Sequence, residues 1–241
     1  MKILGIIPVR LASTRLPGKP LIDICGKSMI QRVYEQGKKS HLLNDVVVAA
    51  DDNKIIENVK SFGGKAILTS KRHKSGTDRI CEVLDSYRCD IAVNIQGDEP
   101  MISPFDIDKA IKPMLKDKMI DVSTLAIRIY DAEEISDPNN VKVVFGDNRI
   151  ALYFSRSVIP YNRDSEKKIN YYKHIGLYVY RYKALQEFRN LKQSKLEKAE
   201  KLEQLRLLEN GYRIYVELTK NNTIGIDTAE DLKRIKNILG K

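Results

Sequence analysis

No stretch of this sequence approaches the roughly 20 consecutive apolar residues that a helix needs to cross a lipid bilayer. The N-terminus also lacks the basic and then apolar layout of a signal peptide. Cysteine is scarce: Cys25, Cys81 and Cys89 form an odd set without Cys-x-x-Cys spacing, which argues against a disulfide framework or a zinc site. We therefore expect a cytoplasmic protein in a reducing compartment, with no membrane insertion.

Internal repeats, low-complexity tracts and obvious linkers are also missing, so we expect a single domain over residues 1–241. The formal charge is +10, and nucleic-acid binding is one interpretation of that excess. The densest lysines, in residues 192–201, alternate with glutamates, which is more typical of a solvated helix face. The net charge therefore leaves nucleic acid and a small anionic substrate both open as partners.

Strands and helices are predicted to alternate in the first half of the chain. Apolar runs predict buried strands at residues 3–7, 45–50, 65–68 and 90–95. Apolar residues at helical spacing predict helices at residues 28–39, around 55–59 and from 77 onward. This alternation is typical of an α/β fold with a parallel sheet and crossover helices.

The second half departs from that alternation. Residues 141–145 and 149–154 are predicted to form a hairpin around Gly146-Asp147-Asn148. We therefore expect an antiparallel portion on a mostly parallel sheet. Further elements are expected at residues 121–129 (strand), 196–208 (a helix with a leucine stripe) and 212–218 (strand).

A basic loop follows the first predicted strand. It carries Arg10, Arg15 and Lys19, and its prolines and Gly18 prevent a helix or strand from continuing. Ligands of open α/β sheets bind beyond the carboxyl ends of the strands, where this loop would lie. The three positive charges predict a clamp for phosphate groups; the alternative is a solvated basic loop.

A polar segment, residues 69–79, precedes the third predicted helix. We expect Thr77 to be the N-cap of that helix. A helix N-terminus with neighbouring hydroxyl and basic side chains suits an anion or a polar base. His73 alone is a weak signal, because a single histidine is more often structural than a ligand.

Two acidic positions are candidates for metal binding. Asp98 and Glu99 arrive at the end of the strand predicted at residues 90–95, where carboxylates commonly hold Mg²⁺ on a substrate phosphate. The alternative is a cap for the next helix, but Ser103 already supplies that cap. Asp227 precedes a second capping box and is either part of it or a second metal ligand, if the fold brings it to Asp98.

A later strand combines histidine and tyrosine on one face. Alternation along residues 173–180 places His174, Gly176, Tyr178 and Tyr180 on the same side. Such a face suits either a wall for a hydroxyl-rich ligand or a contact between copies of the chain, and the residues leave both open.

Taken together, these segments closely resemble the 3-deoxy-manno-octulosonate (Kdo) cytidylyltransferases. The opening loop alone is typical of nucleotidyltransferases in general, whereas the ordered set is specific to the Kdo branch. The matching segments are residues 7–21, 73–79, 94–100, 151–156, 174–178, 202–206 and 225–228.

The resemblance implies a Rossmann-like nucleotidyltransferase fold, dependence on Mg²⁺ and a homodimer. It implies that CTP and Kdo give CMP-Kdo and pyrophosphate, for lipopolysaccharide biosynthesis, by in-line attack of the anomeric hydroxyl on the α-phosphorus. The residues it implies for CTP are Arg10, Ser13, Arg15, Lys19, His73, Ser75, Gly76 and Arg79. Those implied for the sugar acid are Gln96, Arg156, His174, Tyr178, Glu203 and Gln204. Lys19, Asp98 and Asp227 are implied as catalytic, with Asp98 and Asp227 as ligands of Mg²⁺.

The chain departs from the family pattern in two places. No proline follows Ser194, and residues 160–164 replace a Pro-Trp-x-Arg stretch. Both lie in segments implied for the sugar or the dimer, so CMP transfer to a related acid, such as 8-amino-Kdo, is the alternative. A nucleotide- or RNA-binding protein without catalysis has the charge of +10 as its only support. Lys19, Asp98 and Asp227 speak against it, because a binding module needs no paired metal carboxylates, and we therefore expect no nucleic-acid partner.

Overall fold

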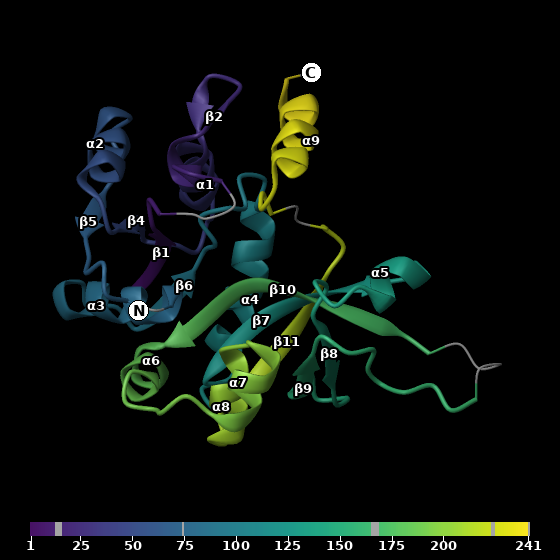
Figure 1. Ribbon diagram of the computed structural model, residues 1–241. Helices are drawn as coiled ribbons and strands as arrows, with labels where there is room; N and C mark the ends of the chain where they lie inside the picture. The colour runs from purple at the N-terminus through teal and green to yellow at the C-terminus, as the bar shows by residue number, and fades with distance from the viewer. Residues whose placement is uncertain (13–15, 74, 165–168, 223–224, 241) are drawn as a thin grey trace. The chain divides into compact units, whose positions relative to one another are not determined.

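Two units make up the chain, residues 1–108 with 223–241 and residues 109–222 (Figure 1). The computed structural model describes residues 1–12, 16–73, 75–164, 169–222 and 225–240. The single domain expected over residues 1–241 stays a prediction.

Four parallel strands form the sheet of the first unit. Their order is β6 (Ile91–Asn94), β1 (Ile3–Val9), β4 (Asp45–Ala50) and β5 (Ala66–Leu68). They are nearly continuous apolar runs, as expected for strands that are covered on both faces. The four strands predicted for this half of the chain are therefore confirmed.

Helices cover both faces of that sheet (Figure 1). They are α1 (Met29–Lys38), α2 (Asn53–Ser61) and α3 (Gly76–Ser86). Gly5 and Gly37 both lie against Val46, which places α1 on the Gly5 face of β1. Gly76 lies against Pro8, on the opposite face because successive strand residues alternate, so α3 covers the other side.

The C-terminal helix α9 (Ala229–Leu239) completes the first unit (Figure 1). It packs beside a small hairpin, β2 (Asp23–Ile24) and β3 (Lys27–Ser28). The contact is an apolar cluster in which Ile24, Met29, Ile226 and Ile235 are buried. This cluster anchors the segment that precedes α9, which carries Asp227.

The sheet of the second unit is mixed. β11 (Ile214–Thr219) pairs in parallel with β7 (Val122–Ile129), and β7 pairs antiparallel with β10 (Tyr171–Arg181). β8 (Lys142–Phe145) pairs antiparallel with both β10 and β9 (Ala151–Ser155). A mostly parallel sheet with an antiparallel portion in the second half is confirmed.

The remaining elements are short helices and one long helix. α4 (Pro104–Lys116) begins directly after Ser103, as predicted. The others are α5 (Ala132–Ser136), α6 (Tyr182–Phe188), α7 (Lys195–Glu200), α8 (Gln204–Glu209) and the 3₁₀ turn η1 (Lys19–Leu21).

Two predictions about helices are wrong. The single helix predicted over residues 196–208 is two helices, because Lys201 takes the left-handed conformation (φ 56°) and ends α7. Leu202 and Leu205 of the predicted stripe are buried, whereas Leu196 at its start is 39% exposed. Thr77 is not the N-cap of α3; Ser75 caps it by accepting a hydrogen bond from the backbone N–H of Asp78.

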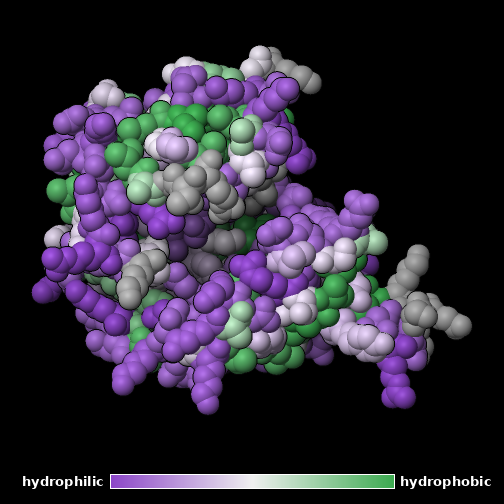
Figure 2. Space-filling view, in the orientation of Figure 1, coloured by the Kyte–Doolittle hydropathy of each residue, from purple (hydrophilic) through white to green (hydrophobic). Residues whose placement is uncertain are grey.

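The face shown in Figure 2 is largely hydrophilic, with apolar patches among the polar residues. Within the described ranges, none of the helices combines the length and apolar character that a bilayer-spanning segment requires.

Candidate functional site

Lys19 is held by a turn that the sequence specifies. Gly18 takes the left-handed conformation (φ 66°) at the start of η1, and the N–H of Leu21 donates to its carbonyl at 2.8 Å. A residue with a Cβ is strained in that conformation, which explains the glycine. Pro20 is buried, which anchors the turn from which the Lys19 side chain extends.

Asp98 reaches the same place from β6. A Cβ on Gly97 would lie 2.3 Å from Val9 Cγ1 and 3.2 Å from the Pro8 carbonyl oxygen. Only glycine allows this close approach of the loop after β6 to the end of β1. Because β6 and β1 are neighbouring parallel strands, their carboxyl ends bring Asp98 to the loop that carries Lys19.

Asp227 comes from a segment more than a hundred residues later. The N–H of Ile226 donates to the Asp98 carbonyl at 2.9 Å, which ties this segment beside Asp98. The capping box of α9 is made by Thr228 and Asp231. The Asp227 side chain accepts a hydrogen bond from Lys19 instead, which answers whether the fold brings it to Asp98.

These three side chains form a compact charged cluster in the first unit. Lys19 Nζ donates to Asp98 Oδ2 at 2.8 Å and to Asp227 Oδ1 at 3.0 Å. Lys19 is only 14% exposed, whereas Asp98 and Asp227 are 37% and 50% exposed. The two carboxylates therefore converge on one cation and remain accessible to a ligand.

The donor set suits a magnesium ion. Mg²⁺ prefers oxygen ligands and is usually held by one or two carboxylates together with substrate phosphates and water. Asp98 and Asp227 are two such carboxylates, already gathered around a positive charge. Among the described residues, no group of three or more His, Cys, Asp and Glu side chains gathers as a metal site. The pair fits an ion that is completed by its substrate.

The basic loop is described only in part. Arg10 follows the last residue of β1 and is exposed. The next N–H, that of Leu11, donates to Asp51 Oδ1 at 2.9 Å, so β4 fixes the start of the loop. Ser13 and Arg15 lie outside the described residues.

Arg79 is buried beneath this loop. Its Nη2 lies 3.6 Å from Asp51 Oδ2, and its Nη1 donates to Thr69 Oγ1 at 2.5 Å. Burial lowers the pKa of Arg79, and the charge of Arg10 nearby adds to that, while Asp51 and Glu82 oppose it. Asp51 thus joins Arg79 and the backbone of the loop, which gives Arg79 a structural contact besides its predicted role toward CTP.

The other residues predicted for CTP surround the N-terminus of α3. His73 Nε2 is hydrogen-bonded to the Glu82 carboxylate. Burial raises the pKa of Glu82, but the Ser70 N–H and His73 outweigh that effect and the net pKa is lowered. Ser75 caps α3 and Gly76 is its first residue, so both stand at the positive end of the helix dipole. Gly76 lies against Pro8, so the N-terminus of α3 packs against β1.

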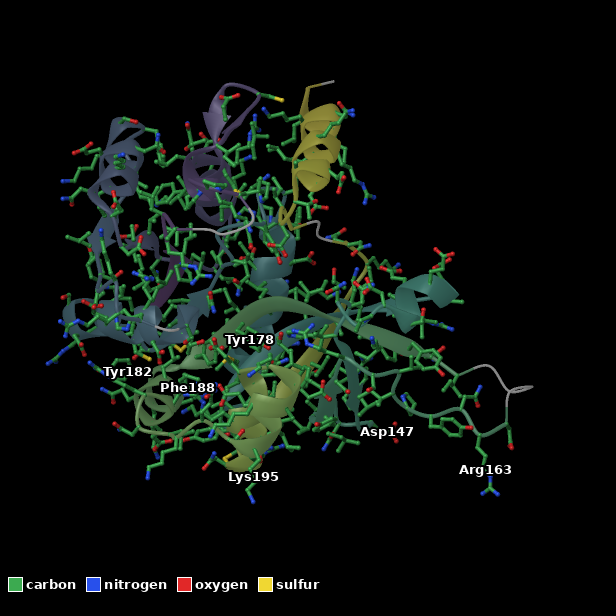
Figure 3. All side chains as sticks on the ribbon, viewed as in Figure 1. Asp147, Arg163, Tyr178, Tyr182, Phe188 and Lys195 are labelled. Atoms are coloured by element: carbon green, nitrogen blue, oxygen red, sulfur yellow. The ribbon has the colours of Figure 1, made fainter. Side chains whose placement is uncertain are left out.

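Of the residues predicted for the sugar acid, Gln96 belongs to the first unit and the others to the second. Gln96 follows β6 and is partly buried. In the second unit, His174 lies on β10 with Tyr178, which Figure 3 labels, and their ring centroids are 5.2 Å apart. Burial, then the charges of Tyr180 and Glu203, raise the pKa of Tyr178 well above its usual range. The hydroxyl of Tyr178 is buried and has no hydrogen-bond partner among the described residues.

Arg156 is fixed by neutral groups. Its Nε donates to the Glu200 carbonyl at 2.8 Å and its Nη1 to the Pro138 carbonyl at 3.0 Å. The Glu200 carboxylate instead accepts from the backbone N–H of Arg156 at 2.9 Å and from Ser155 Oγ at 2.6 Å. Among the described residues, backbone carbonyls therefore orient the guanidinium and no carboxylate is paired with it, which suits an anionic ligand.

Glu203 and Gln204 stand at the turn between α7 and α8 rather than within one helix. Arg206 locks this turn by a bidentate pair with Glu197, with nitrogen–oxygen distances of 2.5 and 2.7 Å. Glu197 is 2% exposed, and the Arg206 guanidinium also lies over the Phe188 ring, 4.3 Å from its centroid. The turn that presents Glu203 and Gln204 is thus rigid.

One segment that departs from the family pattern lies on the surface. Tyr161 is 87% exposed, and Arg163 extends away from the second unit (Figure 3).

The sequence did not point to Lys142, which is fully buried. Its Nζ donates to the carbonyls of Asp137 at 2.9 Å, Asn140 at 2.6 Å and Arg156 at 2.7 Å. Burial lowers the pKa of this ammonium. A lysine inside an otherwise apolar strand was the available signal, and its role is to hold the backbone around Arg156.

We expect Lys142→Met to lower the free energy of unfolding by about 2–4 kcal/mol, because three partly buried carbonyls lose the donor that the buried ammonium supplies. Urea denaturation measures this loss. Lys183→Met is the matched control, since Lys183 is 84% exposed and its pairing with Glu187 contributes about 0.5 kcal/mol or less. Equal stability of the two variants would contradict the structural role of Lys142.

Comparisons with known proteins agree with this geometry. The chain matches the family described as Cytidylyltransferase over residues 4–217. It is 50% identical over 241 residues to the 3-deoxy-manno-octulosonate cytidylyltransferase of Syntrophus aciditrophicus (strain SB), covering 99% of this chain and 97% of that protein. It is 49% identical over 251 residues to the protein of the same name from Geotalea uraniireducens (strain Rf4), covering 100% of both.

Two solved structures are also similar to this chain. One is described as CMP:2-keto-3-deoxy-manno-octonic acid synthetase complexed with CTP; it is 45% identical, with a TM-score of 0.96 over 100% of this chain and 99% of that one. A cytidylyltransferase from Leptospira borgpetersenii serovar Hardjo-bovis (strain JB197) is 18% identical, with a TM-score of 0.69 over 100% of this chain and 87% of that one, and shares the fold alone. The predicted nucleotidyltransferase fold is confirmed.

Proposed function

The chain belongs to the 3-deoxy-manno-octulosonate cytidylyltransferase family, and from this membership we propose that it transfers CMP from CTP to Kdo with release of pyrophosphate. The observation that carries the proposal is the cluster of Lys19, Asp98 and Asp227 at the carboxyl ends of β1 and β6. This is where open α/β sheets bind their ligands.

The reaction needs charge neutralisation and alignment more than covalent chemistry. The anomeric hydroxyl of the sugar attacks the α-phosphorus in line, the bond to the β-phosphate oxygen breaks, and pyrophosphate leaves. Lys19 offsets the negative charge that develops on the transferring and leaving groups. Arg10, Ser13 and Arg15 bind the phosphates from the same loop.

We propose that Asp98 and Asp227 hold Mg²⁺ on the triphosphate, which their shared contact with Lys19 supports. Bound there, the ion would neutralise phosphate charge and lower the pKa of an oxygen that it binds. The two aspartates keep the charge of the site negative enough to attract the ion, and Lys19 keeps them oriented.

The base and ribose of CTP are assigned to the N-terminus of α3. His73, Ser75, Gly76 and Arg79 gather there, and a helix N-terminus offers backbone N–H donors to an anion or a polar base. This part of the proposal is supported by placement in the fold and by the family pattern of residues 73–79.

The sugar acid is assigned to Gln96, Arg156, His174, Tyr178, Glu203 and Gln204. Arg156 binds the carboxylate, since its guanidinium is oriented by carbonyls and keeps its charge for a ligand. Glu203 and Gln204 supply an acceptor and an amide to the hydroxyls. We also propose that the enzyme is a cytoplasmic homodimer and serves lipopolysaccharide biosynthesis, as its family resemblance implies.

The test is pyrophosphate release with CTP and a panel of sugar acids that includes Kdo, 8-amino-Kdo and a sialic-type acid. We expect turnover with Kdo, and no turnover with any Kdo-type acid would refute the proposal. Preference for the 8-amino acid would select the alternative substrate. Tight RNA binding in a gel-shift at physiological salt, without CTP-dependent activity, would favour the nucleic-acid alternative.

The same assay tests the carboxylate clamp. Arg156→Ala is expected to raise KM for the sugar acid about 10- to 100-fold, because a charge-assisted hydrogen bond contributes about 1.5–3 kcal/mol. KM for CTP is expected to stay within about twofold. Arg88→Ala is the matched control, since Arg88 is exposed and lies in none of the segments assigned to CTP or the sugar acid. An unchanged KM for the sugar acid in Arg156→Ala would show that another group binds the carboxylate.

A further inference from the structure

An irregular pairing between β7 and β10 surrounds Thr124. Ile175 pairs with Leu125, but the next pair along is Tyr178 with Thr124, so β10 has two extra residues at this point. Two extra residues leave the alternation in phase, and His174 and Tyr178 stay neighbours on one face. The bulge turns the carbonyls of Ile175 and Leu177 toward Thr124 Oγ1, at 3.1 and 2.8 Å.

His174 also contacts this hydroxyl. Its Nε2 lies 2.9 Å from Thr124 Oγ1, and Thr124 is fully buried. A threonine hydroxyl has one proton and two lone pairs. The carbonyls of Ile175 and Leu177 are acceptors only, so the single proton of Thr124 is committed to them. The contact with His174 is therefore satisfied when Nε2 donates its proton to Oγ1.

The ring of His174 is neutral. Burial lowers the pKa of His174 to about 3. A neutral imidazole with a proton on Nε2 carries its lone pair on Nδ1. The Phe154 and Tyr178 rings pack against the imidazole, with centroids 5.1 and 5.2 Å away, and hold its plane.

We propose that Thr124 is a positioning residue that fixes His174 as the Nε2–H tautomer, so that Nδ1 accepts a hydrogen bond from a hydroxyl of the sugar acid. The inference rests on the proposed function for the nature of the ligand, while the tautomer follows from the contacts around Thr124. Nothing in the sequence pattern pointed to Thr124, because the bulge that aims two carbonyls at it is a tertiary feature.

This assignment separates the roles of the residues that face the sugar. The lone pair on Nδ1 repels a carboxylate but accepts a hydrogen bond from a hydroxyl. His174 therefore binds a hydroxyl of the sugar acid, and Arg156 binds its carboxylate. Tyr178, whose buried hydroxyl has no partner among the described residues, is the neighbouring group that a second sugar hydroxyl would satisfy.

Nuclear magnetic resonance tests the tautomer directly. The chain has three histidines, so long-range ¹H–¹⁵N correlations are simple to assign, with His174→Gln identifying the signals of His174. We expect a protonated Nε2 and an unprotonated Nδ1 for His174 at neutral pH. Thr124→Val removes the acceptor and is expected to shift His174 to a mixture or to the Nδ1–H form, while Thr124→Ser keeps the wild-type pattern. A protonated Nδ1 in the wild type, or an unchanged pattern in Thr124→Val, would overturn the proposal.

Steady-state kinetics tests whether the tautomer of His174 affects binding of the sugar acid. Thr124→Val is expected to raise KM for Kdo about tenfold, the size expected for losing one buried hydrogen bond, with KM for CTP unchanged and near-normal values in Thr124→Ser. An altered tautomer with an unchanged KM for Kdo would overturn the role in recognition. Should Thr124→Val fail to fold, the wild-type spectrum and Thr124→Ser still decide the tautomer. A wild-type enzyme that turns over no Kdo-type acid would refute the proposed function. The tautomer of His174 is measured from the spectrum of the free protein and does not depend on that result.

Discussion

Asp98→Asn is expected to lower kcat for CMP transfer by about 10²- to 10³-fold, the loss typical of removing one preorganised electrostatic contact from an active site. The substitution keeps the size and shape of the side chain but removes the charge that, with Asp227, converges on Lys19. It therefore weakens the proposed metal site without opening a cavity. Pyrophosphate release at increasing Mg²⁺ measures the effect.

The fold should survive this change. Asp98 is 37% exposed, and pairs at such positions typically contribute about 0–1 kcal/mol to stability. Asp52→Asn is the matched control, because Asp52 also pairs with a lysine, Lys71, at 3.4 Å, and asparagine replaces aspartate well as the N-cap of α2. Wild-type turnover of Asp98→Asn at saturating Mg²⁺ would refute the role of Asp98.

The strands of the first unit could be predicted because each is a short apolar run that stops at polar residues. The strand predicted at residues 45–50 ends where Asp51 and Asp52 begin, and β4 has these bounds. Strand order then explains part of the site, since the loops after neighbouring parallel strands meet at one edge. The contact of Lys19 with Asp98 is the result.

The third member of the cluster could not be placed by spacing. Asp227 joins Lys19 and Asp98 through a backbone hydrogen bond from Ile226 and the buried apolar cluster beneath α9. Both are tertiary contacts between segments far apart in the chain. The sequence showed the capping box from Thr228 to Asp231 but left open whether Asp227 assists that cap or reaches Asp98.

The break between α7 and α8 could not be predicted from the residue types around it. Lys201 takes a left-handed conformation that favours glycine, so no residue type signals the end of α7. The break is stabilised by partners elsewhere: Glu197 with Arg206, and the N–H of Leu196 with Glu209 Oε2 at 3.2 Å. Packing of two short helices overrides a leucine pattern that one long helix would also satisfy.

Lys19→Met is the second large effect that we expect, a fall in kcat of about 10²- to 10³-fold. The Lys19 side chain is 14% exposed and extends from η1, so its ammonium acts on the phosphates from a fixed position. Methionine keeps much of the aliphatic length but cannot neutralise charge. Asp98 and Asp227 lose the cation between them, so their mutual repulsion also changes the geometry of the carboxylate pair.

Steady-state kinetics with each substrate varied in turn separates the possible roles of Lys19. A residue that acts on the transferring phosphoryl group lowers kcat, and KM for the sugar acid should change little. Lys27→Met is the matched control, because Lys27 pairs with Glu35 at 2.6 Å and is 43% exposed. An effect of Lys19→Met on KM for the sugar acid alone would place Lys19 with the acceptor, and the triphosphate would then need another cation to offset its charge.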